Sequence, residues 1–161
     1  MEKLHVLSVK VNNNSGVLTK VAGLFARRAY NIDSLSVGET EIPNISRMTI
    51  VVRADDLTFE QIKNQLAKLI DVIEIIELNN GKAVLREHVL VQVDNSGDRA
   101  EFMFIIDTFR GRVVDISENT LIAELTGSPS KISAFIKMLE PFGIKTLVRT
   151  GVTGLERSSA E

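Results

Sequence analysis

A short polar stretch, residues 12–18 with the sequence NNNSGVL, carries residue types suited to binding a small molecule. At a helix start the first N–H groups lack intrahelical acceptors, and the helix dipole adds partial positive charge. The N–H groups of Gly16, Val17 and Leu18 are therefore candidates to hold a carboxylate, since glycine permits close approach. A nearby Asn carbonyl would accept from an ammonium group, and Val17 and Leu18 offer aliphatic contact. Together these are the parts of an amino-acid site.

The same string also suits an ordinary helix start with no ligand. Asn14 or Ser15 would then act as the N-cap, and Gly16 would lie in the first turn. Taken alone, the residues leave both interpretations open.

The rest of the sequence offers no catalytic or metal-binding motif. His5 and His88 lie in predicted strands without paired metal-ligand spacing, which favours ordinary strand histidines. Asp55-Asp56 precedes a predicted helix and suits a turn with helix-start acidity better than a general acid. The phosphate-binding patterns G-x-x-x-x-G-K-[ST] and G-x-G-x-x-G do not occur. We therefore expect no catalytic residue, metal ligand or cofactor in this chain.

Nucleic-acid binding is poorly supported. The net charge is −2, with acidic and basic residues nearly balanced on both sides of Gly81. The basic stretch at residues 109–112 (FRGR) fits a helix end followed by a glycine turn, although a phosphate or RNA contact is the alternative. The aromatic signature of RNA-binding modules is missing, and there is one Tyr and no Trp.

Hydrophobic periodicity predicts the elements that would position the polar stretch. Alternation with period two indicates strands, and apolar residues at i, i+3 and i+4 indicate amphipathic helices. In the first half of the chain these patterns predict strands at 4–11, 31–38, 46–54 and 72–78, and helices from residue 16 and at 58–70. In the second half they predict strands at 84–94, 112–116, 121–126 and 144–150, with helices after Asp98 and after Ser128.

The order β-α-β-β-α-β therefore occurs twice, which predicts an α+β fold of two ferredoxin-like modules in tandem. We expect the domains at residues 1–78 and 84–161, joined by a linker at 79–83. The chain has 161 residues and no cysteine, so disulfides and zinc–thiolate sites are excluded. No stretch approaches the roughly 18 apolar residues of a transmembrane helix. A cytoplasmic protein is expected, although an organellar protein that has lost a transit segment would fit as well.

The chain resembles one family along nearly its whole length. The strings NxSGVL at 13–18, GLFARR at 23–28, YNIDSL at 30–35 and SRMTI at 46–50 resemble the small regulatory subunit of acetolactate synthase (acetohydroxyacid synthase). The resemblance continues through LIDV at 69–72, VLRE at 84–87, FRGRVVD at 109–115 and RTGV at 149–152. NxSGVL alone would be weak, but the ordered series is specific, and residues 1–78 resemble an ACT domain, a ferredoxin-like amino-acid sensor.

The resemblance implies a non-catalytic subunit that activates a large catalytic subunit and confers feedback inhibition by valine or another branched-chain amino acid. The large subunit would carry thiamine diphosphate, FAD and Mg²⁺. The effector would bind at a homodimer interface between paired ACT domains. Asn13, Gly16, Val17 and Leu18 of one chain would meet Asn31 and Ile32 of its neighbour, with Asn13 and Asn31 anchoring the ligand. Nothing in the residues themselves singles out Asn31.

Two positions depart from the family pattern, and two other functions compete. Ala29 stands where relatives commonly carry glycine, and Asn14 where they often carry an acidic or other polar residue; each bears on the geometry or charge of the pocket. The first alternative is a stand-alone amino-acid-binding regulator without an enzyme partner. The second is an RNA-binding module, which the charge and missing aromatics disfavour.

Overall fold

The computed structural model describes residues 1–78 and 81–158, which form two compact units. The first unit comprises Met1–Val84 and the C-terminal segment that begins at Val152, and the second comprises Leu85–Gly151. Within the expected linker, residues 79–80 lie outside the described residues, Gly81 and Lys82 form a turn, and Ala83 begins a strand.

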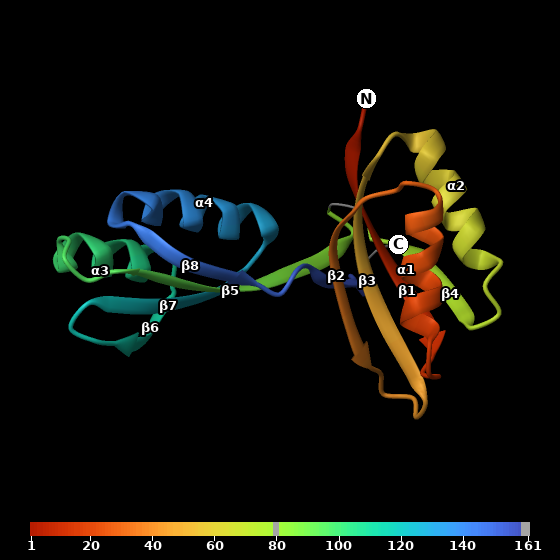
Figure 1. Ribbon diagram of the computed structural model, residues 1–161, viewed down its shortest axis with the longest axis horizontal. Helices are drawn as coiled ribbons and strands as arrows, with labels where there is room; N and C mark the ends of the chain where they lie inside the picture. Colours follow the sequence, from red (N-terminus) through yellow and green to blue (C-terminus); the bar gives the residue numbers. More distant parts are fainter. Residues whose placement is uncertain (79–80, 159–161) are drawn as a thin grey trace. The chain divides into compact units, whose positions relative to one another are not determined.

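The first unit is a four-stranded antiparallel sheet with two helices on one face (Figure 1). The strand order is β2-β3-β1-β4, so β2 and β4 are the end strands of this sheet in the described chain. In sequence order the elements are β1 (Lys3–Asn12), α1 (Val17–Arg27), β2 (Ile32–Glu39), β3 (Ile45–Ala54), α2 (Asp56–Ala67) and β4 (Val72–Glu77).

Alternating residues of the two central strands form the core beneath these helices. Leu7, Val9 and Val11 of β1 are buried, and so are Met48 and Ile50 of β3. Val21 and Phe25 of α1 and Ile62 and Leu66 of α2 pack against them. The apolar residues that alternate along the strands and those that recur every 3.6 residues along the helices therefore pack into a single apolar layer.

The second unit repeats this plan with its own core. A sheet of order β6-β7-β5-β8 carries α3 and α4 on one face (Figure 1). Ser128 accepts a hydrogen bond from the N–H of Lys131 and caps α4, as Ser128-Pro129 predicts. The elements are β5 (Ala83–Asp94), α3 (Arg99–Thr108), β6 (Arg112–Ile116), β7 (Thr120–Gly127), α4 (Pro129–Leu139), a short 3-10 helix (Glu140–Phe142) and β8 (Ile144–Arg149).

The tandem ferredoxin-like α+β fold is thus confirmed, and one strand was not predicted. The strand β9 (Thr153–Glu156) pairs with β5, and the N–H of Arg157 donates to the carbonyl of Lys82 at 2.8 Å. Residues 153–157 therefore return to the start of β5. Among the helices of the described residues, none combines the length and the apolar character needed to span a membrane.

Candidate functional site

The polar stretch joins β1 to α1, and Gly16 is the N-cap of the helix. Gly16 adopts a left-handed conformation (φ 85°), which glycine reaches without the steric cost of a Cβ. In the described chain no side chain hydrogen-bonds to this helix end. The interpretation with Asn14 or Ser15 as N-cap is therefore wrong. By contrast, α2, α3 and α4 are capped by Asp55, Asp98 and Ser128 respectively.

Backbone N–H groups at this helix start have no acceptor in the described chain. The N–H of Val17 donates to the carbonyl of Asn14 at 3.3 Å, whereas the N–H groups of Gly16 and Leu18 have no acceptor among residues 1–78 and 81–158. The side chains of the predicted aliphatic pair also differ. Val17 is 4% exposed and belongs to the core, while Leu18 is 46% exposed. Of the two side chains, only that of Leu18 is open to solvent.

The other predicted site residues lie where α1 leads into β2. Asn31 is exposed, and its Nδ2 donates to Oδ1 of Asp33 at 3.3 Å. Oδ2 of Asp33 accepts from Arg53 at 3.4 Å, which links β2 to β3. Ile32 is half-buried and packs against the core. Asn31 and Asp33 also line a cavity of about 310 Å³, together with Tyr30, Arg53, Thr58 and Ile62 among others.

The two groups of site residues lie at opposite ends of one sheet. Asn13 follows the end of β1, where Asn12 pairs with Ile45. Ile32 pairs instead with Val52, which on its other side pairs with His5 near the start of β1. Because a strand rises about 3.4 Å per residue, His5 and Asn12 are about 24 Å apart. One chain therefore cannot bring Asn13 and Asn31 to the same small ligand.

The β1–α1 loop is held by two neighbouring connections. The N–H of Asn13 donates to the carbonyl of Asn44 in the β2–β3 hairpin at 2.8 Å. On the other side, Asp71 accepts from the backbone of Asn12 and from the side chains of Asn14 and Lys20. Asp71 is 7% exposed, and the hydrogen bonds from Lys20 and then Asn14 lower its pKa. Sequence reasoning missed Asp71, since its partners are more than fifty residues away.

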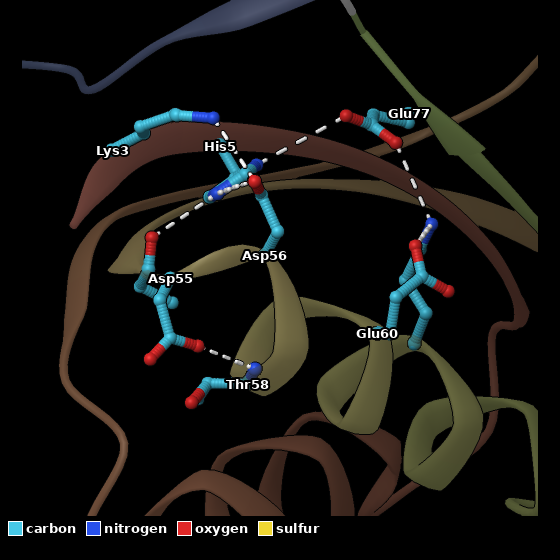
Figure 2. Close-up of polar contacts among 9 residues, drawn as sticks. Lys3, His5, Asp55, Asp56, Thr58, Glu60 and Glu77 are labelled. Atoms are coloured by element: carbon cyan, nitrogen blue, oxygen red, sulfur yellow. Dashed lines mark hydrogen bonds and ion pairs between the residues drawn. The ribbon is translucent and has the colours of Figure 1, made fainter. Parts of the chain in front are cut away.

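His5 and the acidic pair at residues 55–56 have structural roles. Figure 2 shows the carboxylate of Asp55 directed at the N–H of Thr58, which it accepts at 2.7 Å, as an N-cap does. Its pKa is lowered by the hydrogen bond from the Thr58 N–H. The ring of His5 is stacked on Phe59, with 3.9 Å between centroids. Its Nε2 lies 3.2 Å from the carbonyl oxygen of Ala54. These contacts fix the start of α2 on β1.

The basic stretch at residues 109–112 is also structural. Phe109 is the C-cap of α3, Arg110 adopts φ 59°, and β6 begins at Arg112. Gly111 is required by close packing, because an added Cβ would lie 2.9 Å from the carbonyl oxygen of Glu124. The predicted helix end is confirmed, but the left-handed residue of the turn is Arg110, and Gly111 follows it. In the described parts of the chain, no group of three or more His, Cys, Asp or Glu residues is arranged to hold a metal ion.

Comparison with known proteins agrees with the two-unit architecture. Residues 7–74 match the family model described as the small-subunit-like ACT domain of acetohydroxyacid synthase, and residues 86–158 match that of the small subunit of acetolactate synthase. The probable acetolactate synthase small subunit of Methanothermobacter thermautotrophicus is 47% identical over 96% of this chain and 94% of its own length. The acetolactate synthase small subunit of Aquifex aeolicus is 46% identical over 95% of this chain and 81% of its own.

A solved structure shows the same fold. The crystal structure of the acetolactate synthase small subunit from Thermotoga maritima superimposes with a TM-score of 0.88 and 39% identity. The match covers 96% of this chain and 98% of that one. With both modules matched by family models and relatives aligned along their length, this chain belongs to the acetolactate synthase small-subunit family and carries that family's ACT domain at its N-terminus.

Proposed function

We propose that this chain is a non-catalytic regulatory subunit that activates an acetolactate synthase catalytic subunit and makes it sensitive to inhibition by valine or another branched-chain amino acid. Family membership supports the enzyme partner. The observation that carries the effector site is the helix start at Gly16. It lacks a side-chain cap in the described chain, and the N–H groups of Gly16 and Leu18 lie beside an exposed leucine side chain.

These groups match an aliphatic amino acid. The N–H groups and the positive end of the helix dipole suit its carboxylate. The carbonyl groups of the asparagine side chains suit its ammonium group. The exposed apolar surface of Leu18 suits a branched aliphatic side chain.

The site is completed in a homodimer whose two β2 strands pair in antiparallel fashion about a two-fold axis. β2 is an end strand in the described chain, so its outer edge can accept another strand. The two-fold axis places the start of the partner's β2 beside the C-terminal end of β2 in this chain. At that end Glu39 pairs with Ser46. The backbone N–H of Asn13 donates a hydrogen bond to the carbonyl of Asn44 at that same end of the sheet. Asn31 and Ile32 from one chain therefore meet Asn13, Gly16 and Leu18 from the other.

Acetolactate formation by the cognate catalytic subunit tests the proposal. The rate is measured with and without this chain, across titrations of valine, isoleucine and leucine. The account predicts stimulation that at least one of these amino acids reverses. Stimulation that none of them reverses would remove the effector site from the proposal. Amino-acid binding by the chain without any stimulation would favour a stand-alone sensor instead.

A further inference from the structure

Asp71 lies between α2 and β4 and contacts the β1–α1 loop through both its backbone and its side chain. The N–H of Asn12 donates to its carbonyl oxygen at 2.9 Å. One carboxylate oxygen accepts from Nδ2 of Asn14 at 3.2 Å, and the other accepts from Nζ of Lys20 at 2.9 Å. A single residue thus joins the end of β1, the loop and the first turns of α1.

We infer that Asp71 is a positioning residue for the effector site, which fixes the β1–α1 loop in the conformation that presents the Gly16 and Leu18 N–H groups to the effector carboxylate. This inference rests on the proposed function. Asp71 itself does not touch the effector; it acts through Asn14 and Lys20.

Asn14 connects Asp71 to the N–H groups at the start of α1. Its side chain is held by Asp71, and its carbonyl accepts the N–H of Val17 at 3.3 Å. The orientation of Asn14 therefore sets how the chain enters the helix through the left-handed Gly16. Asn14 is exposed and its backbone lies outside any strand or helix, so without this hydrogen bond the loop would sample more conformations.

Lys20 offsets the negative charge that Asp71 brings close to an anion site. Its ammonium group lies 2.9 Å from the carboxylate, so the pair is nearly neutral when viewed from the helix start. The Lys20 side chain is 55% exposed, but the Asp71 side chain is only 10% exposed, so the pair is partly buried and contributes to stability. Removing the Asp71 carboxylate should therefore loosen the loop and also lower the stability of the fold.

Asp71→Asn is the test, with Glu74→Gln as its matched control. Glu74 lies in β4, pairs with Lys10 at 2.9 Å and makes no contact with the loop among the described residues. Valine binding to the purified chain is measured by calorimetry, and half-maximal inhibition is measured in the complex with the catalytic subunit. Urea unfolding of each variant gives its stability.

We expect Asp71→Asn to raise the valine Kd and the half-maximal valine concentration about fivefold, because binding must now order the loop. The urea midpoint should fall modestly, because a buried carboxylate loses its charge, and the stimulation without valine should persist in the folded chain. Glu74→Gln should change none of these, and Asp71→Glu should recover part of the affinity. When Asp71→Asn is added to an Asn14→Ala chain, the valine Kd should change little further. The reason is that the two side chains act through one contact.

An unchanged Kd in Asp71→Asn, with the wild type binding valine, would overturn the inference while leaving the proposed function in place. A lowered Kd would also overturn it, because it would show that the freed Lys20 ammonium group recruits the carboxylate. If Asp71→Asn raises the Kd as much in Asn14→Ala as in the wild type, Asp71 does not act through Asn14 and its role is merely structural. If the wild type binds none of the three amino acids, the proposed effector site and the role of Asp71 both fail.

Discussion

Asn13 and Asn31 stand at opposite ends of the same four-stranded sheet. The register shows this directly: Asn12 pairs with Ile45 at one end, whereas Ile32 and His5 both pair with Val52 near the other. A valine molecule is only a few ångströms long and cannot bridge this distance within one chain. The proposed site therefore depends on two chains.

Gly16→Asp should make the complex insensitive to valine while leaving it active. An added Cβ at Gly16 would meet nothing within 4 Å, so the side chain has room, but φ 85° strains any residue that carries a Cβ. Two like charges about 4 Å apart repel by about 4 kcal/mol at an effective dielectric constant of about 20, so inhibition should require at least about tenfold more valine. Inhibition curves of the complex measure this change.

Gly16→Asn is the control for that substitution. Asn has nearly the same shape as Asp and tolerates the left-handed conformation, but it carries no charge. It should shift the valine curve much less than Gly16→Asp does. Full inhibition of the Gly16→Asp complex at the wild-type valine concentration would mean that the site lies elsewhere.

Truncation of Leu18 should weaken valine binding, whereas truncation of Val17 should lower stability. Leu18→Ala removes an exposed side chain, so stability should change by less than about 0.5 kcal/mol, while the valine Kd rises roughly fivefold through lost apolar contact. Val17→Ala removes part of the core and should lower the free energy of unfolding by about 2 kcal/mol. Calorimetry and urea unfolding separate the two effects, and equal valine affinity in Leu18→Ala would exclude a ligand contact.

Ala29→Gly should stabilise the chain by about 1 kcal/mol. Ala29 has φ 56°, a left-handed conformation that costs a residue with a Cβ more than it costs glycine. Ala22→Gly provides the comparison, since Ala22 is exposed within α1 and the same change there should destabilise by about 1 kcal/mol. Urea midpoints that shift in the same direction for both variants would refute the argument from backbone conformation.

Glu87→Gln should destabilise the second unit. Glu87 is 4% exposed and accepts two hydrogen bonds from Arg149, at 2.6 and 2.8 Å, which join β5 to β8. The pair raises the pKa of Arg149, whose charge would lose its partner. Because the Arg149 side chain is 37% exposed, we expect a loss of about 2 kcal/mol, below the roughly 3–5 kcal/mol of a fully buried pair.

The double variant Glu87→Met with Arg149→Leu is the control for that pair. It removes both charges and keeps apolar volume between the strands, so it should be more stable than Glu87→Gln. Urea unfolding compares them. A Glu87→Gln variant as stable as the wild type would show that the pair contributes nothing.

Local patterns were sufficient to predict the fold. Strands with period two, such as residues 46–54, and helices with a clear apolar stripe appear within a few residues of their predicted bounds. The strand at 153–156 was not predicted because four residues are too few to show a period, and its partner β5 lies far away in sequence. The role of Gly111 was also hidden, since close packing against Glu124 is a tertiary contact.

The candidate site was only partly predictable from the residues. The loop at 12–18 has the composition of an anion site, and anion binding at a helix start can be predicted from neighbouring residues alone. Asp71, in the neighbouring connection just before β4, holds the Asn14 side chain, and this contact between residues distant in sequence could not be predicted locally. Asn31 carries no local signal at all and entered through family resemblance alone.

Mixed dimers test the central claim, that each effector site is shared by two chains, most directly. Gly16→Asp and Asn31→Ala chains are prepared separately, shown to be insensitive to valine, mixed so that heterodimers form, and assayed with the catalytic subunit. In a heterodimer one site carries both substitutions and the other carries neither, so the account predicts that mixing restores part of the valine inhibition. If each site were built within one chain, every chain would remain defective. A mixture that stays insensitive would therefore contradict the account.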